Sequence, residues 1–399
     1  MPAAPEIREA IRTGSWIRRM FEEGEALKAA RGAGNVFDFT LGNPYGDPPV
    51  PLARELARLA ADPPPDLHKY MPNAGFPEVR RAVADSLTRS TGLPFSTDLI
   101  VMSVGAAGAI NVSLRAILSP GDEVVVLAPY FVEYLYYVRN AGGVPVVVET
   151  DARFQLDPAA VDRALTPRTR AVLLNTPNNP TGAVYPAEDL EALDRVLTAA
   201  EARFGAPVYV ISDEPYRKVV FAGVSFVQPV TRIRNTVVAY SHSKDLNLPG
   251  ERIGYLAVSP RAADAAEVAE ACGFCTRVLG FVNAPALFQR AVAKFQDLPA
   301  DVSVYQANRD VLLRALGRAG IEVVPPGGAF YLFPKCPLPD EMAFLAAARE
   351  EGILVVPGSG FGRAGHFRLA YCVSPEVVAG SVPAWERLGA RIAGKGGAG

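Results

Sequence analysis

The stretch SHSKDLNLPGERIG at residues 241–254 is the most informative part of this chain. Two hydroxyl side chains, Ser241 and Ser243, lie just before Lys244, and the guanidinium of Arg252 follows eight residues after that lysine. A planar guanidinium and short O–H donors match the oxygens of a phosphate group. A lysine beside a phosphate site is typical of proteins that hold a phosphorylated aldehyde cofactor as a Schiff base. The stretch therefore predicts that Lys244 is a nucleophilic amine next to a bound phosphate.

Three short apolar runs along the chain end in polar residues. These runs have the length and composition of β-strands and are residues 171–175, 208–211 and 236–240. The first is followed by a turn that contains Asn179, and the third by Lys244. The second is followed by Asp213 and Tyr216. Because ligands bind at the carboxyl ends of strands in an open parallel sheet, we expect these side chains to meet in one site.

The same side chains match the chemical needs of pyridoxal phosphate. A buried carboxylate at Asp213 would keep the pyridine nitrogen protonated, so that the ring accepts electrons from a substrate carbanion. Tyr216 and Asn179 are both able to donate hydrogen bonds to the phenolic oxygen of the ring. Phe131 follows the strand-like run 124–128 and is placed to stack on the ring face. We therefore expect pyridoxal phosphate as the cofactor.

A predicted helix start is suited to the phosphate of this cofactor. Residues 104–111, VGAAGAIN, open a predicted helix that runs to about Leu118. Gly105, Ala106 and Ala107 are small, so the backbone N–H groups of the first turn can approach an anion. We expect this turn to bind the phosphate together with the hydroxyls and the guanidinium of the lysine stretch.

The order and spacing of these motifs resemble those of a known family. The chain is similar to fold-type I pyridoxal-phosphate enzymes of the class I/II aminotransferase family, related to aspartate aminotransferases. The resemblance covers nearly the whole chain, from about Phe37 to Tyr371. The motifs that carry it are NNPTG at 178–182, DEPY at 213–216, KYMP at 69–72, GGAFY at 327–331, FRLAY at 367–371 and the lysine stretch at 241–254.

The resemblance implies roles for individual residues. Arg368 would grip the α-carboxylate of the substrate with help from Asn179, and the backbone of Gly42 would lie beside that substrate. Tyr70 would reach the cofactor phosphate of a partner subunit, which implies a homodimer. The implied substrates are amino acids and 2-oxo acids. The residues implied to hold the phosphate are Ser241, Ser243, Arg252 and residues 105–107.

Two departures from the family pattern concern substrate choice and phosphate binding. Ala106 and Ala107 stand where relatives often carry hydroxyl or larger polar residues, so more of the phosphate binding falls to the backbone. In one branch of the family a lysine occupies the place of Ala107. We find no obvious cation for the side-chain carboxylate of aspartate or glutamate. The resemblance therefore predicts the type of reaction but not aspartate as the substrate.

The alternation of strand and helix signals predicts an α/β fold. We expect a large domain over residues 52–284, with a mainly parallel sheet covered by helices on both faces, as in the PLP-transferase fold type I. Residues 285–399 are predicted to form a smaller α/β domain, with a long helix followed by strands near 321–324 and 330–333. Residues 1–51 are predicted to form an N-terminal arm and part of the smaller domain. The active site would then lie between the domains.

Composition indicates a soluble enzyme. The 399 residues include 40 basic and 42 acidic side chains, with a net charge of −2 and no basic run, so we expect no nucleic-acid partner. No apolar run approaches the roughly 20 residues of a membrane span, and residues 1–19 do not resemble a signal peptide. The four cysteines do not suggest disulfides or a metal site. We therefore predict a cytoplasmic protein without a metal.

The hypothesis that follows is a ping-pong transamination between an L-amino acid and a 2-oxo acid, with Lys244 moving the proton and with Asp213 and Tyr216 tuning the cofactor. A β-lyase that cleaves a C–S bond remains an alternative, because the same site can break different bonds at the substrate Cα. A non-catalytic cofactor-binding regulatory domain is a more remote alternative. The chain offers no room for a DNA-binding domain before about residue 35, which argues against it.

Overall fold

The computed structural model describes residues 3–13 and 16–396. Its largest element is a seven-stranded sheet with the order β2-β8-β7-β6-β5-β3-β4. Its strands are β2 Ile100–Ser103, β3 Glu123–Ala128, β4 Val144–Glu149, β5 Thr169–Asn175, β6 Tyr209–Asp213, β7 Thr236–Ser241 and β8 Gly254–Val258. Only β8 runs against its neighbours; the remaining pairings are parallel. The sheet is therefore mainly parallel, as predicted.

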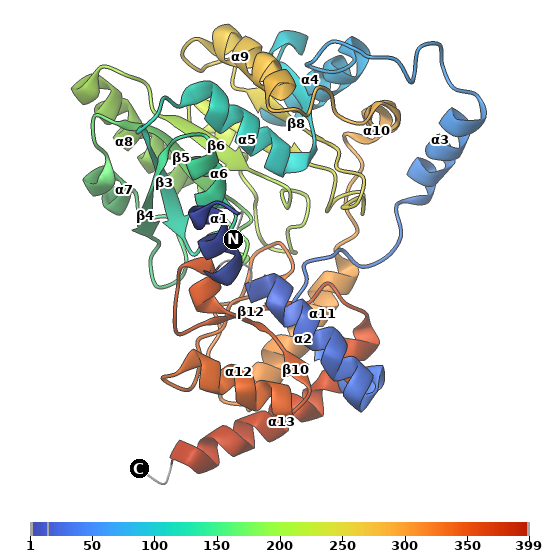
Figure 1. Ribbon diagram of the computed structural model, residues 1–399, viewed down its shortest axis with the longest axis vertical. Coiled ribbons are helices and arrows are strands. Elements are labelled where there is room, and N and C mark those ends of the chain that lie inside the picture. The colour runs from blue at the N-terminus through green and yellow to red at the C-terminus, as the bar shows by residue number, and fades with distance from the viewer. Residues whose placement is uncertain (1–2, 14–15, 397–399) are drawn as a thin grey trace.

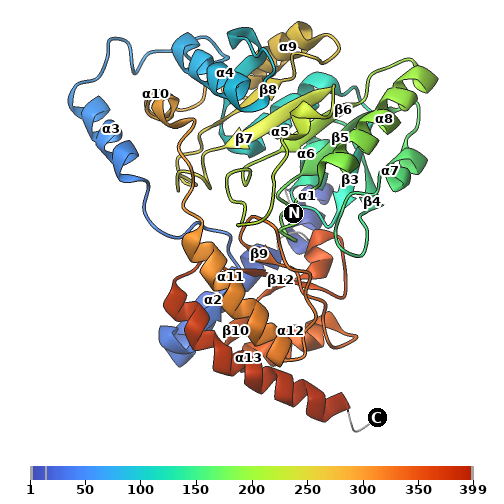
Figure 2. The same ribbon diagram turned by 180° about the vertical axis from the view of Figure 1, so that it is seen from behind.

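Helices cover both faces of this sheet, as the alternation of buried side chains along β3 shows. Val124 and Val126 pack into a core shared with α5 Gly105–Ile117, α6 Tyr134–Asn140 and α9 Ala265–Val278. Val125 and Leu127 point the other way, into a core shared with α7 Pro158–Ala164 and α8 Ala187–Phe204. Strands buried on both faces read as continuous apolar runs, which is why β3 and β5 were recognisable in the sequence. Figures 1 and 2 show the two helical layers.

A second, smaller group of elements lies beside the carboxyl edge of the sheet (Figure 1). It has a three-stranded sheet, β11-β12-β9, and a two-stranded pair in which β1 runs parallel to β10. Their bounds are β1 Phe37–Asp38, β9 Tyr331–Leu332, β10 Ile353–Leu354, β11 Val356–Pro357 and β12 Phe367–Ala370. Phe39, Phe330, Phe367 and Trp385 lie in its own buried core. The predicted domain limits stay a prediction, and the pairing of β1 with β10 supports placing part of residues 1–51 in the smaller domain.

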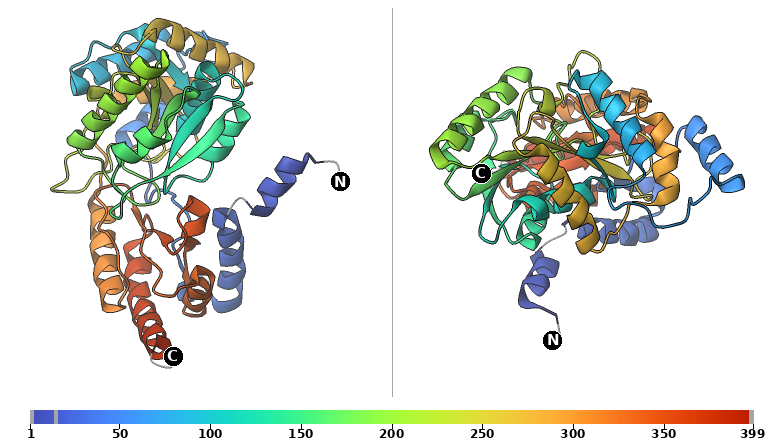
Figure 3. Two further views of the ribbon diagram at one scale, coloured as in Figure 1. Left: turned by 90° about the vertical axis from the view of Figure 1, so that its left-hand side faces the viewer. Right: turned by 90° about the horizontal axis from the view of Figure 1, so that it is seen from above.

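Eight further helices lie in the part of the chain that the structure describes. They are α1 Pro5–Thr13, α2 Trp16–Arg31, α3 Val50–Ala61, α4 Pro77–Thr91, α10 Ala286–Val292, α11 Ser303–Arg318, α12 Glu341–Glu350 and α13 Pro375–Gly396. Short 3₁₀ turns occur at Ala33–Asn35, Thr97–Leu99, Pro229–Thr231, Ala293–Phe295 and Gly358–Phe361. Helix α1 projects away from the rest of the molecule (Figure 3). No helix among the described residues combines the length and the apolar character needed to cross a bilayer.

Two sequence predictions about the smaller group are wrong. The helix expected from residue 285 is divided into α10 and α11, with a break that includes Pro299, which has no N–H to continue a helix. The strand expected at residues 321–324 does not form. Pro325 and Pro326 follow directly and cannot donate to a ladder. Apolar, β-branched composition was therefore not enough to form a strand here, because a strand also needs a neighbouring strand to pair with. The predicted helix after residue 104, in contrast, is confirmed as α5.

Gly254 should be irreplaceable, because β8 meets β7 and α5 at this point. A Cβ at Gly254 would lie 2.1 Å from the carbonyl oxygen of Tyr240 and 3.1 Å from the Cα of Gly105. We expect Gly254→Ala to lower the free energy of unfolding by roughly 3 kcal/mol or more, since backbone atoms must move apart. Denaturant unfolding monitored by circular dichroism measures this.

Gly317→Ala is the matched control for that substitution. Gly317 is exposed on α11 and a Cβ there meets nothing within 4 Å. The gain in helix propensity should stabilise this variant by roughly 0.5–1 kcal/mol. Equal effects of the two substitutions would contradict the packing described at Gly254.

Candidate active site

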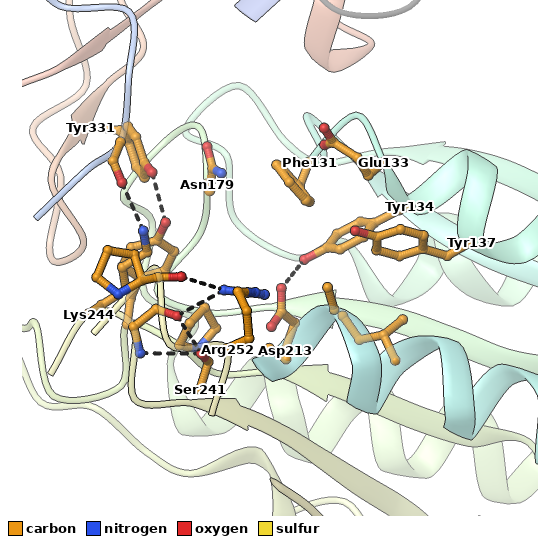
Figure 4. Close-up of a pocket in the computed structure, with 18 of the residues that line it drawn as sticks. Phe131, Glu133, Tyr134, Tyr137, Asn179, Asp213, Ser241, Lys244, Arg252 and Tyr331 are labelled. Carbon is orange, nitrogen blue, oxygen red and sulfur yellow. Dashed lines mark hydrogen bonds between the residues drawn. The ribbon is translucent and has the colours of Figure 1, made fainter. Parts of the chain in front are cut away.

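A cavity of about 380 Å³ opens where the carboxyl ends of β5, β6 and β7 face the smaller group of elements. Its lining brings together Asn179, Asp213 and Lys244, one from the loop after each strand or from the strand end itself (Figure 4). The residues predicted for the site that line the cavity are Gly42, Ala106, Ala107, Phe131, Asn179, Asp213, Tyr216, Ser241, Ser243, Lys244, Arg252 and Arg368. The structure thus collects most of the predicted site residues in one place.

Lys244 is the central amine of this cavity. Its Nζ donates a hydrogen bond to the carbonyl oxygen of Gly42 at 2.8 Å. Residue 42 must be a glycine in this position, because a Cβ there would lie 2.0 Å from the hydroxyl of Tyr331. Burial lowers the pKa of Lys244 to about 8, and the positive charges of Arg252 and Arg368 add to the effect. The amine is therefore partly neutral near neutral pH, as a nucleophile requires.

Asp213 is a buried carboxylate whose two oxygens differ. Oδ2 accepts a hydrogen bond from the hydroxyl of Tyr134, and Oδ1 has no partner among the described residues. Burial raises the pKa of Asp213 to about 7, although the bond from Tyr134 opposes the rise. A buried carboxylate oxygen without a donor is costly, so this atom is suited to a ligand that brings a positively charged N–H.

Tyr134 is a site residue that the sequence interpretation missed. It lies at the start of α6, three residues after Phe131, and its ring meets that of Phe131 edge to face with centroids 5.6 Å apart. Its partner Asp213 is 79 residues away along the chain. The only available signal was its spacing from Phe131, which suggested nothing without knowledge of the turn between them.

Ser241, Ser243 and Arg252 form a polar corner of the cavity, and Gly105, which was predicted for the site, does not line the cavity but lies directly against this corner. The hydroxyls of Ser241 and Ser243 are 2.7 Å apart, and Nη1 of Arg252 lies 3.5 Å from the Ser243 hydroxyl. A Cβ at Gly105 would lie 2.7 Å from the guanidinium of Arg252 and 3.4 Å from the Ser241 hydroxyl. Helix α5 begins here without a side-chain cap, so its first N–H groups are available to an anion.

Arg368 lies on β12 at the opposite wall and is almost fully buried, with 2% of its surface exposed. Its Nη1 donates to Oδ1 of Asn179 at 3.1 Å, and its Nη2 donates to the carbonyl of Thr40 at 2.6 Å. Its Nε has no partner among the described residues. A buried guanidinium without a carboxylate partner is suited to an anionic ligand.

Tyr216 and Tyr331 meet in this cavity through their hydroxyls, which are 2.8 Å apart. Tyr331 was part of a recognised motif but was not predicted to line the site. Phe131 lines the cavity as expected, while its stacking on a cofactor stays a prediction. Tyr70 lies elsewhere, with 92% of its surface exposed, so the role predicted for it needs a second subunit.

Glu133 and Tyr137 also line the cavity, and neither was predicted from sequence. They lie one turn apart at the start of α6. Burial raises the pKa of the Glu133 carboxyl, against smaller opposing effects of its own backbone N–H and the charge of Arg368. The same kind of burial raises the pKa of the Tyr137 hydroxyl, with the charge of Glu133 adding to it.

These features fit a phosphorylated pyridine aldehyde. The polar corner at Arg252 suits a phosphate, the unpaired Oδ1 of Asp213 suits a ring N–H, and the amine of Lys244 suits an aldehyde carbon. The fold and the site thus have the features expected of an α/β enzyme that uses a pyridoxal-type cofactor.

Comparison with known proteins gives the same class. A sequence profile of the aminotransferase class I and II family matches residues 34–381. The chain is 38% identical to an aspartate/prephenate aminotransferase of Thermus thermophilus, over 88% of this chain and 90% of that protein. It is 33% identical to an aspartate aminotransferase of Geobacillus stearothermophilus, over 77% of this chain and 80% of that protein.

Solved structures agree with the fold. An aminotransferase from Eubacterium rectale superposes with a TM-score of 0.94 and 38% identity, covering 98% of this chain and 99% of that one. Aspartate aminotransferase from Thermus thermophilus with maleate superposes with a TM-score of 0.85 and 33% identity, covering 97% of this chain and 100% of that one. This chain belongs to the aminotransferase class I and II family. The predicted family and fold class are thereby confirmed.

The lowered pKa of Lys244 predicts unusual reactivity in the cofactor-free protein. Trace acylation followed by peptide mass spectrometry should show the modification rate of Lys244 rising with pH around a midpoint of about 8. Lys28 is an internal control: burial lowers its pKa, but the hydrogen bonds that its ammonium donates to Glu25 and Asp38 raise the pKa overall, so its rate should rise only at higher pH. A midpoint for Lys244 at its ordinary value of 10.5 would contradict the described environment.

Proposed function

We propose that this protein is a pyridoxal-phosphate-dependent aminotransferase that moves an amino group between an L-amino acid and a 2-oxo acid by a ping-pong mechanism. The observation that carries the proposal is the placement of one lysine amine between two opposed anion sites. The polar corner at Arg252 follows the large sheet and the buried guanidinium of Arg368 lies on β12 of the smaller group, and both line the cavity that contains Lys244 and lower the pKa of its amine. A cytoplasmic location and a homodimer belong to the same proposal.

The cofactor would be held by residues of the large sheet. When bound, pyridoxal phosphate supplies an electron sink that stabilises negative charge at the substrate Cα. Ser241, Ser243 and Arg252 would bind its phosphate together with the first turn of α5. Asp213, oriented by Tyr134, would accept the ring N–H on Oδ1. Bringing that positive charge next to Asp213 would restore its ionised form, because an opposite charge lowers the pKa of a carboxyl.

The substrate would be held by residues of the smaller group of elements. Arg368 would bind the α-carboxylate through its guanidinium, and Asn179 would keep that guanidinium in place by accepting from Nη1. Because Asn179 uses its carbonyl for this bond, its NH₂ group is the part that can donate to a ligand. The bound carboxylate would orient the Cα–H bond towards Lys244.

Lys244 would move the proton in each half of the reaction. Its pKa of about 8 would let the amine accept a proton from the substrate Cα and pass that proton on to the cofactor at neutral pH. The hydrogen bond to the carbonyl of Gly42 fixes the position of the amine before any ligand binds. The second half-reaction would use the same residues in the reverse order with a 2-oxo acid.

An absorbance experiment on the cofactor-loaded protein tests this proposal. Adding single L-amino acids without an acceptor should shift the spectrum to that of the aminated cofactor and release an equivalent amount of 2-oxo acid. Lys244→Ala should reduce turnover by several orders of magnitude, because the proton carrier is lost. Arg368→Lys keeps the charge but loses the planar fork, so kcat/KM should fall at least about a hundredfold.

The alternatives give different outcomes in that experiment. A spectrum that returns to its start while pyruvate and ammonia accumulate would identify a β-lyase instead. Full turnover by Lys244→Ala would remove the basis of the proposed mechanism, and no spectral response to any amino acid would favour a non-catalytic role.

The family resemblance implies that Tyr70 completes the active site of a partner subunit, and its exposed position leaves it available for that role. We expect Tyr70→Ala and Lys244→Ala each to have little activity alone. Unfolding and refolding the two together should restore activity, because a mixed dimer contains one site with both residues intact. Random pairing gives about a quarter of the wild-type activity. Mixtures no more active than the separate variants would show that Tyr70 does not act across the interface.

A further inference from the structure

Glu133 is a carboxylate of the cavity that the proposed mechanism does not use. It lies at the first turn of α6, between Phe131 and Tyr134, and lines the same cavity as Lys244 and Arg368. Figure 4 shows its side chain beside Phe131, away from the polar corner at Arg252 and Ser241. It is therefore placed on the substrate side of the cavity.

The Glu133 side chain is half-buried, and its carboxylate is only partly compensated. Its Oε2 has no hydrogen-bond partner among the described residues, and the side chain does not cap α6. Burial disfavours its charged form, as the raised pKa shows, and Arg368 is the one positive charge that offsets part of this cost. Such a group gains most from a ligand that brings a positive charge or hydrogen-bond donors.

The positive charges that line the cavity already have other roles. Among the described residues they are Lys244, Arg252 and Arg368. Lys244 would carry the cofactor, Arg252 would bind its phosphate and Arg368 would bind the α-carboxylate. Ala107 also lines the cavity and brings no charge. A second carboxylate on the substrate would therefore meet Glu133 without a cation to neutralise it.

We propose that Glu133 determines which amino acids the site accepts, by disfavouring a second carboxylate and favouring a side chain that ends in a cationic nitrogen group. The preferred donors are then basic L-amino acids rather than aspartate or glutamate. This inference rests on the proposed aminotransferase function. It would separate this chain from the relatives named for aspartate.

The test measures ligand discrimination without turnover. Adipate, 4-guanidinobutanoate and hexanoate each carry one carboxylate for Arg368 on a chain of similar length and end in an anion, a cation and a methyl group. Their binding to the cofactor-loaded protein is measured by calorimetry at one pH and one ionic strength, because salt screens charge effects. We expect 4-guanidinobutanoate to bind at least about tenfold more tightly than adipate, with hexanoate between them.

Two variants assign the effect to one carboxylate. Glu133→Gln keeps the size of the side chain and removes its charge, so the preference for 4-guanidinobutanoate over adipate should shrink by about tenfold. Glu188→Gln removes an exposed carboxylate from α8 and should leave the preference unchanged. Thermal unfolding and the cofactor spectrum establish that both variants are folded and loaded. A purely structural role for Glu133 would change stability but not the ratio of the two affinities.

A parallel measurement with reactive donors separates this inference from the function on which it rests. L-Arginine should convert the cofactor spectrum with a higher kcat/KM than L-glutamate, and Glu133→Gln should narrow the difference. Tighter binding of adipate, faster reaction of L-glutamate, or an unchanged ratio in Glu133→Gln would overturn the inference while transamination stands. If no amino acid changes the spectrum, the proposed function fails, and the calorimetric comparison still decides what Glu133 recognises.

Discussion

The parallel register of β5, β6 and β7 is the constraint on which the active site depends. Asn175 pairs with Asp213, which in turn pairs with Ala239, so the ends of the three strands form one row. Asn175 extends this row into the next loop, because its Nδ2 donates to the carbonyl of Asp213 and its Oδ1 accepts from the backbone N–H of Asn179. A slip of one residue would turn every side chain to the other face of the sheet. Sheet register therefore fixes the distance between the cavity's carboxylate, amide and amine.

Buried charge below the cavity holds the lysine stretch in place. Asp245, next to Lys244, accepts hydrogen bonds from Tyr240 and Lys218 and pairs with His242. Burial alone would raise the pKa of Asp245, but His242 and the other partners lower it overall, so this carboxylate stays ionised. All three of these contacts are made by Oδ2, while Oδ1 has no hydrogen-bond partner among the described residues. The contrast with Asp213 and Glu133 lies in the ion pairs: Asp245 pairs with the ammonium of Lys218, whereas neither Asp213 nor Glu133 forms an ion pair among the described residues.

Local sequence was enough to predict the parts of the site that follow strands. Asn179, Asp213 and Lys244 each come after an apolar run, and parallel strands bring such positions to one edge. Arg368 was assigned to the site only through family resemblance, because no feature of the sequence around β12 indicates that this strand faces the large sheet. Tyr134 and Tyr331 were missed because their partners are 79 and 115 residues away. Whether a side chain has a partner is a property of packing, so the state of Glu133 was not readable from sequence either. The strand expected near residue 321 failed for a related reason, since a strand needs a neighbour that composition does not reveal.

The pairing of β1 with β10 has a consequence for how the chain is made. Phe37 is synthesised early, yet its partner Ile353 emerges roughly three hundred residues later. The large sheet, with strands between residues 100 and 258, has all of its parts before that point. Contacts so distant along the chain close slowly, because the entropy of the intervening loop opposes them. The nascent protein therefore has its large sheet before Arg368 is made, and Gly42 reaches its final position against Tyr331 only late in translation.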